Sequence, residues 1–331
     1  MILHNNDING KVIAITGASG YIGSALSEEL KKYSNKVIRV SRKKLTPSKY
    51  FEDWILDLTL LDSWIKIVKK SDIVFHLSGN TSIYDAEQEP SKNLISTLLP
   101  VTHFVTAAKI LALKPLMVFA STATVYGALS KIPISENDIP EPITNYDTHK
   151  FLAEQILITA HKNEIIDTKI LRLANVYGPS LIEVKSSDRG ILSKLTRMAL
   201  EGENLNVYGD GEYLRDYIYI KDVVAAFLSA TLVNSNESVF NVSSGVGTRV
   251  KDVFELIASE VNKIPKLKIK VRHVEWPNNV SEIEKRNFVG SNNLLKSNTF
   301  WSPNIEIEEG IKLLVEFYVQ EYYQNESSKK N

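Results

Sequence analysis

The sequence of 331 residues contains no cysteine. This absence excludes disulfide bonds, thiolate metal sites and a cysteine nucleophile, and it fits a reducing cytoplasm. The six histidines show no spacing typical of metal ligands, so no bound metal is expected. An excess of charge is absent too, because 39 Lys and Arg residues balance 39 Asp and Glu residues. Nucleic acid is therefore a poor candidate for a partner.

Long apolar runs are also missing. No uninterrupted apolar stretch approaches the ~18 residues that a membrane span needs. The first dozen residues lack the basic start and apolar run of a signal peptide, and residues 324–331 are polar and are expected to fray. What is present is 44% hydrophobic and 24% charged, which is typical of a globular protein. The sequence therefore predicts a cytoplasmic protein without membrane association.

Short apolar runs alternate with amphipathic stretches through the first half of the chain. Strands are predicted at residues 12–16, 37–40, 72–77, 116–120 and 169–173, with helices at 21–33 and 94–113. The runs are near-continuous rather than alternating, as in strands that are buried on both faces. Strands separated by helices predict an α/β fold with a doubly wound parallel (Rossmann) sheet.

The second half is less regular. Strands are predicted at residues 203–207, 239–242 and 268–273, with helices at 222–232, 250–261 and 307–318. We expect residues 1–178 to form the Rossmann domain and residues 179–331 to form mostly a smaller C-terminal α/β lobe. Residues near 215–235 are expected to return to the main sheet.

A glycine-rich loop follows the first predicted strand and opens the first predicted helix. Gly17 permits a tight turn, Gly20 allows close approach of a pyrophosphate, and Gly23 allows the helix to pack closely on the strand. The N–H groups and dipole of the helix then favour phosphate. Glycines alone often make turns only, but this strand–turn–helix context predicts a dinucleotide site. The expected contacts come from Gly17, Ser19, Gly20, Tyr21 and Ile22.

The end of the second predicted strand bears on the choice of nicotinamide cofactor. An acidic residue there would bind the ribose 2′-OH of NAD and repel a 2′-phosphate. The sequence has Ser41 and Arg42 instead. Arg42 can form a charge-assisted contact with a 2′-phosphate, and Ser41 and Lys43 can assist it. NADP(H) is therefore favoured and NAD(H) stays open, because a solvated basic turn is the alternative.

Two further segments lie where the cofactor would pass. They are Asp57 with Leu58, at the adenine end, and Leu77, Ser78 and Gly79, near the second ribose and the pyrophosphate. Asp57 fits a helix N-cap equally well, and the adjacent His76 is typical of a packed core histidine.

Tyr146 and Lys150 are four residues apart and would share one face of a helix. A free tyrosine has a pKa of ~10, which a neighbouring ammonium and an oxidised nicotinamide would both lower. At the carboxyl end of a predicted strand, Thr122 can hydrogen-bond the substrate oxygen whose proton Tyr146 moves. Thr122, Tyr146 and Lys150 are thus the catalytic candidates. Ser121, Tyr146 and Lys150 are expected to contact the cofactor as well.

With these motifs in this order, the chain closely resembles the extended short-chain dehydrogenase/reductase family of nucleotide-sugar epimerases, dehydratases and reductases. The resemblance covers nearly the whole length and rests on residues 14–23, 121–127, 146–150, 171–179, 207–217 and 301–311. It implies an NAD(P)-dependent enzyme whose smaller lobe binds a nucleotide-diphosphate sugar. It further implies that Tyr146 is the acid/base, Lys150 its electrostatic partner and ribose anchor, and Thr122 an orienting hydroxyl.

The resemblance also implies a set of substrate contacts. They are Asn175, Arg215 and Arg286 for the diphosphate, Val207 and Tyr208 for the base, and Ser82 and Thr122 for the sugar. Arg215 could instead form a structural pair with Asp210 or Asp216. Loops at residues 80–83 and 184–190 would sense the sugar's substituents. Family members often dimerise through helices that correspond to residues 94–113 and 151–161, so a homodimer is expected, although these faces fit a core equally well.

The residues after Thr122 separate the reactions of the family. Dehydratases carry an acidic pair there, whereas this chain has Ala123 and Thr124, which argues against a 4,6-dehydratase. A ketoreductase acting at C4 is favoured by Arg42, and a 4-epimerase is suggested by residues 122–127. A non-catalytic NADP-binding sensor is a third reading, but such relatives usually lose the tyrosine or lysine. We favour reduction, with epimerisation as the alternative.

Overall fold

A seven-stranded parallel sheet forms the centre of the molecule in the computed structural model, which describes residues 8–33, 36–129, 131–180, 190–277, 280 and 282–328. Its strands are β1 (Val12–Thr16), β2 (Lys36–Ser41), β3 (Phe51–Ile55), β4 (Ile73–His76), β5 (Leu116–Thr122), β6 (Asp167–Leu173) and β10 (Val239–Val242). They lie in the order β10-β6-β5-β4-β1-β2-β3, and all six pairings are parallel. The order reverses between β1 and β4, as expected for a doubly wound sheet.

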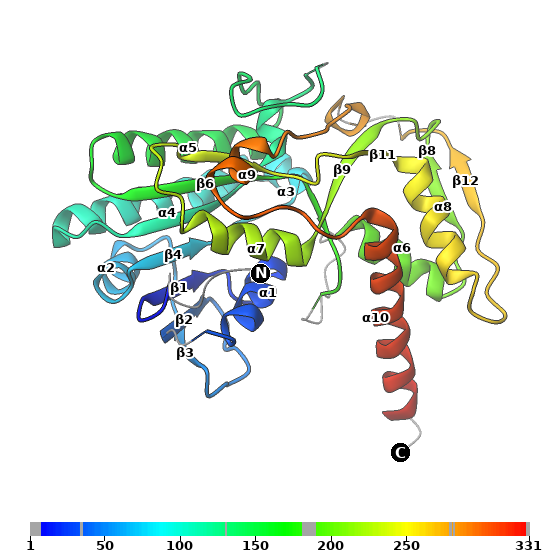
Figure 1. Cartoon of the computed structure of the whole chain (residues 1–331), viewed down its shortest axis with the longest axis horizontal. Helices are drawn as coiled ribbons and strands as arrows, with labels where there is room; N and C mark the ends of the chain where they lie inside the picture. Colours follow the sequence, from blue (N-terminus) through cyan, green and yellow to red (C-terminus); the bar gives the residue numbers. More distant parts are fainter. Residues whose placement is uncertain are drawn as a thin grey trace.

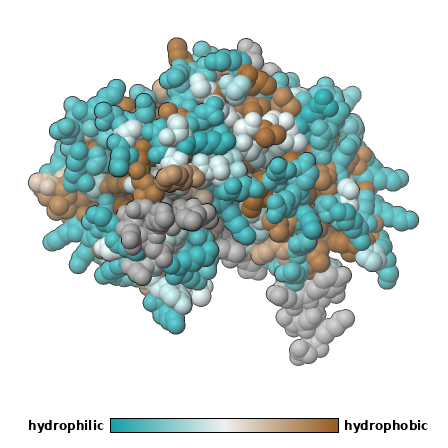
Figure 2. All heavy atoms as spheres, viewed as in Figure 1, coloured by the Kyte–Doolittle hydropathy of each residue, from teal (hydrophilic) through white to brown (hydrophobic). Residues whose placement is uncertain are grey.

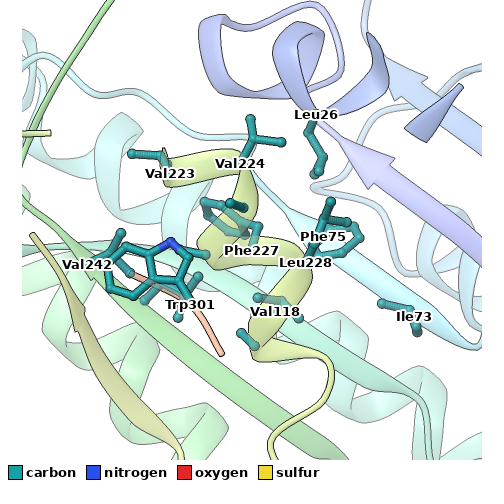
Figure 3. Close-up of a cluster of buried hydrophobic side chains, with 14 of the residues drawn as sticks. Leu26, Ile73, Phe75, Val118, Val223, Val224, Phe227, Leu228, Val242 and Trp301 are labelled. Carbon is teal, nitrogen blue, oxygen red and sulfur yellow. The ribbon is translucent and has the colours of Figure 1, made fainter. Parts of the chain in front are cut away.

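Helices cover both faces of this sheet (Figure 1). One face packs on α1 (Tyr21–Leu30) and α7 (Ile220–Ala230), and the other packs on α2 (Leu61–Lys70), α4 (Pro90–Leu111) and α5 (Asn145–Lys162). Figure 3 shows the first of these two cores, where the rings of Phe227 in α7 and Phe75 in β4 meet edge to face at 6.2 Å. Burial on both faces explains why the apolar runs of the strands are near-continuous.

A smaller lobe, at the right of Figure 1, follows the sheet domain. Its strands are β7 (Asn175–Tyr177), β8 (Leu205–Tyr208), β9 (Leu214–Tyr219), β11 (Gly247–Arg249) and β12 (Val271–Val274), and its helices are α6 (Ile191–Leu200), α8 (Val250–Val261) and α10 (Ile307–Ser328). Shorter elements are α3 (Ile83–Gln88), α9 (Asn293–Asn298), η1 (Ala123–Tyr126) and η2 (Glu282–Lys285). Side chains of α6, α8 and α10 share a hydrophobic core with β8 and β9.

Several elements depart from the expected pattern. Among them, β3, α2 and α6 were not predicted, and α10 continues to Ser328, so the expected fraying from residue 324 is wrong for 324–328. No glycine or proline interrupts that polar segment, so the helix can continue into it. Residues near 220–230 return to the main sheet as α7, and β10 also joins it. The domain boundary at residue 178 stays a prediction, and most of the loop at 184–190 lies outside the described residues.

Helix α4 corrects the expectation about apolar runs. Across its 22 residues it is long and apolar enough to cross a membrane, with a mean hydropathy of 1.5 in its most apolar window. One face of it packs against α2 and α5 in the second core, which is the usual reason for such a composition in a globular protein. In the view of Figure 2, hydrophilic residues cover most of the visible surface, and hydrophobic residues form smaller patches.

Candidate active site

The dinucleotide loop lies between the end of β1 and the start of α1, at the point where the strand order reverses. Gly17 has a φ of +72°, and a Cβ atom there would lie 2.7 Å from the backbone nitrogen of Ser78. A Cβ atom on Gly23 would lie 2.2 Å from the carbonyl oxygen of Gly17. No side chain caps α1 at Gly20, so the first N–H groups of the helix are left for an anion. This cradle of bare backbone fits the pyrophosphate of a dinucleotide.

Strand β2 ends at Ser41, which is buried, and the chain reaches solvent at Arg42. The hydroxyl of Ser41 donates a hydrogen bond to the carbonyl oxygen of Lys43, while the side chain of Arg42 lies in solvent. Asp57 accepts hydrogen bonds from the backbone nitrogen and hydroxyl of Thr59, at 2.9 and 2.8 Å. These bonds chiefly lower the pKa of Asp57, and the charge of Arg42 adds to the effect. Asp57 thus forms a turn ahead of α2 rather than its N-cap, with Arg42 near enough to attract it.

The segment after β4 connects the dinucleotide loop to the catalytic helix. Leu77 donates its backbone N–H to the carbonyl of Thr16, and a Cβ atom on Gly79 would lie 3.8 Å from the Nζ atom of Lys150. His76 is buried, with its Nδ1 atom 2.7 Å from the hydroxyl of Thr16. Burial, aided by the charge of Lys150, lowers the pKa of His76 to about 3. His76 is therefore a neutral core histidine, as expected.

Tyr146 is placed by the first turn of α5. That turn is fixed by a capping box in which the hydroxyl of Thr144 accepts from the N–H of Asp147, and the Asp147 carboxylate accepts from the N–H of Thr144. Tyr146 is buried and lies close enough to Thr122, at the end of β5, for Thr122 to lower its pKa. Burial raises the pKa of Tyr146 above its ordinary value; the Asp147 charge raises it further, and Thr122 opposes the rise. The protein groups together thus do not produce the lowered pKa that was expected beside Lys150.

Lys150 lies one turn further along α5, under the same strand end. Its Nζ atom donates to the carbonyl oxygen of Ala120 at 2.9 Å and lies 4.7 Å from the centre of the Phe119 ring. Burial lowers the pKa of Lys150 to about 8, and the charge of Glu154 opposes that effect. The lysine is therefore held in place by β5 and is poised to lose its proton at mildly alkaline pH.

A buried ion pair lies next to Lys150 and joins β6 to α5. The Arg172 guanidinium in β6 and the Glu154 carboxylate in α5 are 2.6 Å apart, with side chains that are 4% and 0% exposed. The hydroxyl of Ser121 donates to the same carboxylate. The side chain of Ser121 thus faces α5, and its expected contact with the cofactor stays a prediction. Glu154 was not predicted from the sequence, although it follows Lys150 by four residues and so shares its face of the helix.

Two arginines of the smaller lobe lie close together beside η1. Arg215 donates to the backbone carbonyls of Leu214, Glu284 and Arg286, at 3.2 and 2.6 Å for the first two. Arg286 donates to the carbonyl of Gly127 at 3.0 Å, and its Nε atom is buried without a hydrogen-bond partner among the described residues. Burial, and then the charge of Arg215, lowers the pKa of Arg286 to about 10.

These two guanidinium groups suit an anion. Neither makes an ion pair within 4 Å with a carboxylate of the residues that the structure describes. The alternative pairing of Arg215 is not seen, because Asp216 accepts instead from Ser244, Gly245 and Gly290. Bringing two positive charges together with no carboxylate in ion-pair contact costs free energy that a bound diphosphate would return.

The remaining substrate candidates are spread around this centre. Asn175 donates its amide to the carbonyl of Asp216 at 3.1 Å, and Ser82 caps α3 by accepting from the N–H of Asp85. Val207 is buried, whereas Tyr208 is 45% exposed and stacks on Trp276 at 5.3 Å. Their predicted roles toward a sugar nucleotide stay predictions.

Comparison with known proteins agrees with this geometry. The model of the NAD dependent epimerase/dehydratase family matches residues 13–243. The UDP-N-acetyl-alpha-D-glucosaminuronate decarboxylase of Bacillus cytotoxicus is 29% identical over 321 residues, which cover 92% of this chain and 96% of that protein. The GDP-6-deoxy-D-mannose reductase of Pseudomonas aeruginosa is 26% identical, with 91% and 95% covered.

Among solved structures, the UDP-glucose 4-epimerase of Thermotoga maritima with UDP-glucose superimposes with a TM-score of 0.82. It is 28% identical, and the match covers 94% of this chain and 99% of that one. The names of these relatives describe a decarboxylase, a reductase and an epimerase. Similarity of this degree therefore shows the family and the fold, and leaves the particular reaction open.

Proposed function

Because the chain belongs to the NAD dependent epimerase/dehydratase family, whose enzymes are of the extended short-chain dehydrogenase/reductase type, we propose that it transfers a hydride at C4 of a nucleotide-diphosphate sugar. One observation carries this proposal. Arg286 donates to the carbonyl of Gly127, and Gly127 closes the short helix η1 that begins directly after Thr122. Arg215 and Arg286 are thus connected to Thr122 and Tyr146 through the four residues of η1. A diphosphate on the arginines would place its attached sugar near the two hydroxyls.

Each residue of the centre then has a defined task. Tyr146 gives a proton to the C4 oxygen of a keto sugar, or removes one from the C4 hydroxyl, and Thr122 orients that oxygen with a hydrogen bond. Lys150 supplies a positive charge that stabilises the phenolate form of Tyr146. Arg215 and Arg286 hold the diphosphate and so fix the distance to C4.

The cofactor would lie along the carboxyl ends of β1 and β4. The backbone around Gly17 and Gly20 would hold its pyrophosphate, and Lys150 its ribose hydroxyls. When bound, the nicotinamide supplies or accepts the hydride. Residues 41–44 at the end of β2 carry no carboxylate that would oppose a 2′-phosphate, and Arg42 lies exposed there with Asp57 nearby, so we propose NADP(H) as the preferred cofactor.

This preference favours a ketoreductase, because reductases draw on reduced NADPH. A 4-epimerase is the second candidate, favoured by the likeness to the Thermotoga maritima epimerase and by the hydroxyl-rich segment at residues 122–127. The two are separated by incubating the enzyme with NADPH and a nucleotide-linked 4-keto sugar, and separately with UDP-hexoses. Reduction consumes NADPH in proportion to product. Interconversion of UDP-hexoses without any net change in cofactor absorbance would show epimerisation instead.

We also propose that the enzyme is a cytoplasmic homodimer. The outer sides of the two adjoining helices α4 and α5 carry exposed apolar residues, among them Leu94, Ile95 and Leu152, at 40–46% exposure. Burying such residues against a second copy would be favourable. Light scattering on the wild type and on the Ile95→Asp variant tests this proposal, with a shift toward monomer expected for the variant. A wild type that stays monomeric at micromolar concentration would contradict it.

A further inference from the structure

Asp147, next to the catalytic tyrosine, has a feature that helix capping leaves unexplained. Its side chain is fully buried, and its Oδ2 atom accepts from the N–H and the hydroxyl of Thr144, at 3.3 and 2.7 Å. Its Oδ1 atom is buried without a hydrogen-bond partner among the described residues. The capping box needs only one carboxylate oxygen, and a buried unpaired oxygen is costly. The free oxygen therefore calls for another explanation.

A chain of hydroxyls runs from the catalytic tyrosine toward this carboxyl. The hydroxyl oxygens of Thr122 and Thr124 are 2.8 Å apart, and Thr122 lies close enough to Tyr146 to lower its pKa. The hydroxyl of Thr124 in turn stabilises the carboxylate form of Asp147. Arg286, from the loop after η2, contributes a positive charge on the same carboxyl. Asp147 thus lies between the hydroxyl chain and one of the phosphate-binding candidates.

The protonation state of Asp147 dictates which way these hydroxyls point. When the hydroxyls close onto the free Oδ1 atom of a carboxylate, which can only accept, Thr124 donates to it, Thr122 donates to Thr124, and Tyr146 donates to Thr122. The lone pairs of Tyr146 then face a substrate hydroxyl. A neutral carboxylic acid donates to Thr124 and reverses each bond, so that the O–H of Tyr146 faces a substrate carbonyl. The balance between the charged and the neutral form of Asp147 is adjustable, because burial raises its pKa while its hydrogen-bond partners and Arg286 lower it.

We propose that Asp147 is a positioning residue for the proposed C4 hydride transfer, acting as the far end of a proton relay through Thr124 and Thr122 to Tyr146. During oxidation the O–H bond of the C4 hydroxyl breaks and its proton passes to Tyr146. The proton of Tyr146 passes to Thr122, that of Thr122 to Thr124, and that of Thr124 to the Asp147 carboxylate. The hydride from C4 goes to the nicotinamide cofactor, and reduction reverses every transfer.

Three variants separate the relay from the cap. Asp147→Asn keeps an acceptor for Thr144 but cannot take up a proton, and Thr124→Val breaks the hydroxyl chain while it leaves the capping box intact. Thr144→Ala weakens the cap and leaves the relay. We expect the first two to lower kcat by about 10- to 100-fold, with KM for the nucleotide sugar nearly unchanged. Their double variant should be no slower than either single variant.

The pH profile and the control decide the outcome. Asp147→Asn should remove the acidic limb of the kcat profile for oxidation of the C4 hydroxyl, and the limb that falls as Asp147 ionises in the profile for reduction. Thr144→Ala should lower Tm, keep kcat at the optimum pH within about twofold of the wild type, and shift these limbs to higher pH, because the Thr144 hydroxyl no longer lowers the pKa of Asp147. A wild-type kcat and profile in Asp147→Asn would overturn the relay. An equal loss of kcat in Thr144→Ala would also overturn it, because Asp147 would then act through the cap alone.

A second readout needs no turnover and keeps this inference apart from the proposed function. The titration of Tyr146 is followed by ultraviolet difference absorbance against the Tyr146→Phe variant. Because the charge of Asp147 raises the pKa of Tyr146, Asp147→Asn should shift this titration to lower pH. A wild type that converts no nucleotide sugar refutes the proposed function alone. An unchanged titration in Asp147→Asn refutes the coupling whether or not a substrate is found.

Discussion

The proposed catalytic corner and the proposed cofactor-selecting corner of the same sheet differ sharply in how their charges are held. At the ends of β5 and β6, the Arg172–Glu154 pair is buried, and Lys150 binds a strand carbonyl. At the end of β2, Arg42 is exposed, and its charge acts on the nearby side chains of Asp57 and Lys92. At the first corner, hydrogen bonds fix the positions of the charged side chains. At the second corner, the guanidinium group of Arg42 is free to contact a ligand.

This difference follows from the cost of burying charge. A buried ion must be paired and hydrogen-bonded, so each group at the catalytic corner constrains the next. An exposed ion is screened by water and adjusts freely. The contrast suggests that the chemistry of this fold is hard to change by single substitutions, whereas cofactor preference at the β2 end is easy to change.

The largest effect is expected from Tyr146→Phe at the catalytic corner. Removing the hydroxyl takes away the proton donor and should lower kcat by about 1,000-fold, within the usual range for a general acid–base group. Steady-state kinetics with the identified nucleotide sugar measure the loss, and cofactor titration provides the control. A variant that loses cofactor binding together with turnover would show a structural defect instead.

Breaking the buried Arg172–Glu154 pair should lower the free energy of unfolding. In Arg172→Ala the Glu154 carboxylate is left buried without its partner, so the free energy of unfolding should fall by about 3–5 kcal/mol. Lys36→Ala is the control, since Lys36 pairs with Glu52 at 3.1 Å on the surface, with side chains 59% and 45% exposed, and should cost about 1 kcal/mol or less. Urea denaturation of both variants tests the contrast. Equal losses would remove the proposed difference between the two corners.

The pKa of Lys150 predicts an alkaline limit to activity. Because burial lowers this pKa to about 8, the lysine loses its charge above that pH, and kcat/KM should then fall by about tenfold per pH unit. The folded protein then binds fewer protons than the unfolded chain between about pH 8 and 10.5, so this group makes stability rise with pH in that window. A profile that stays flat well above pH 8 would contradict the assignment. Lys150→Arg should move the limb to higher pH.

The smallest effect is expected at the exposed corner. Arg42→Ala should weaken NADPH binding by about tenfold and leave NADH binding nearly unchanged, because only the 2′-phosphate loses a charged partner. Fluorescence titration with both cofactors measures the change, and Lys109→Ala, in the last turn of α4, is a suitable control. Equal affinities of the wild type for NADPH and NADH would contradict the proposal that NADP(H) is the preferred cofactor.

The sequence predicted most of the sheet because its strands are buried on both faces and are therefore read as apolar runs. It missed β3, whose residues Phe51–Ile55 include Glu52 and Asp53 and belong to an edge strand. It also missed α2, although Trp64, Ile67 and Val68 recur at helical spacing and are buried. The helical spacing was present in the sequence, but α2 has 10 residues, so the pattern was too short to be recognised.

For the site, the local motifs were readable and the long-range contacts were not. Tyr146, Lys150 and Thr122 lie within 29 positions of one another, and the structure brings Thr122 close to Tyr146. The approach of Arg286 to Asp147 joins segments far apart in the chain, and it depends on the contact of Arg286 with Gly127 after η1. A side chain that contacts a catalytic candidate from a distant segment leaves no local sequence pattern from which the contact could be predicted.

The most direct test of the account follows the hydride itself. Wild type and Tyr146→Phe are incubated with NADPH that is deuterated at the transferring position and with a nucleotide-linked 4-keto sugar, and the product is examined by mass spectrometry and NMR. The account predicts deuterium at C4 of the sugar with the wild type and almost none with Tyr146→Phe. Deuterium at another carbon, or equal labelling by the two proteins, would contradict hydride transfer at C4 with Tyr146 as the acid/base.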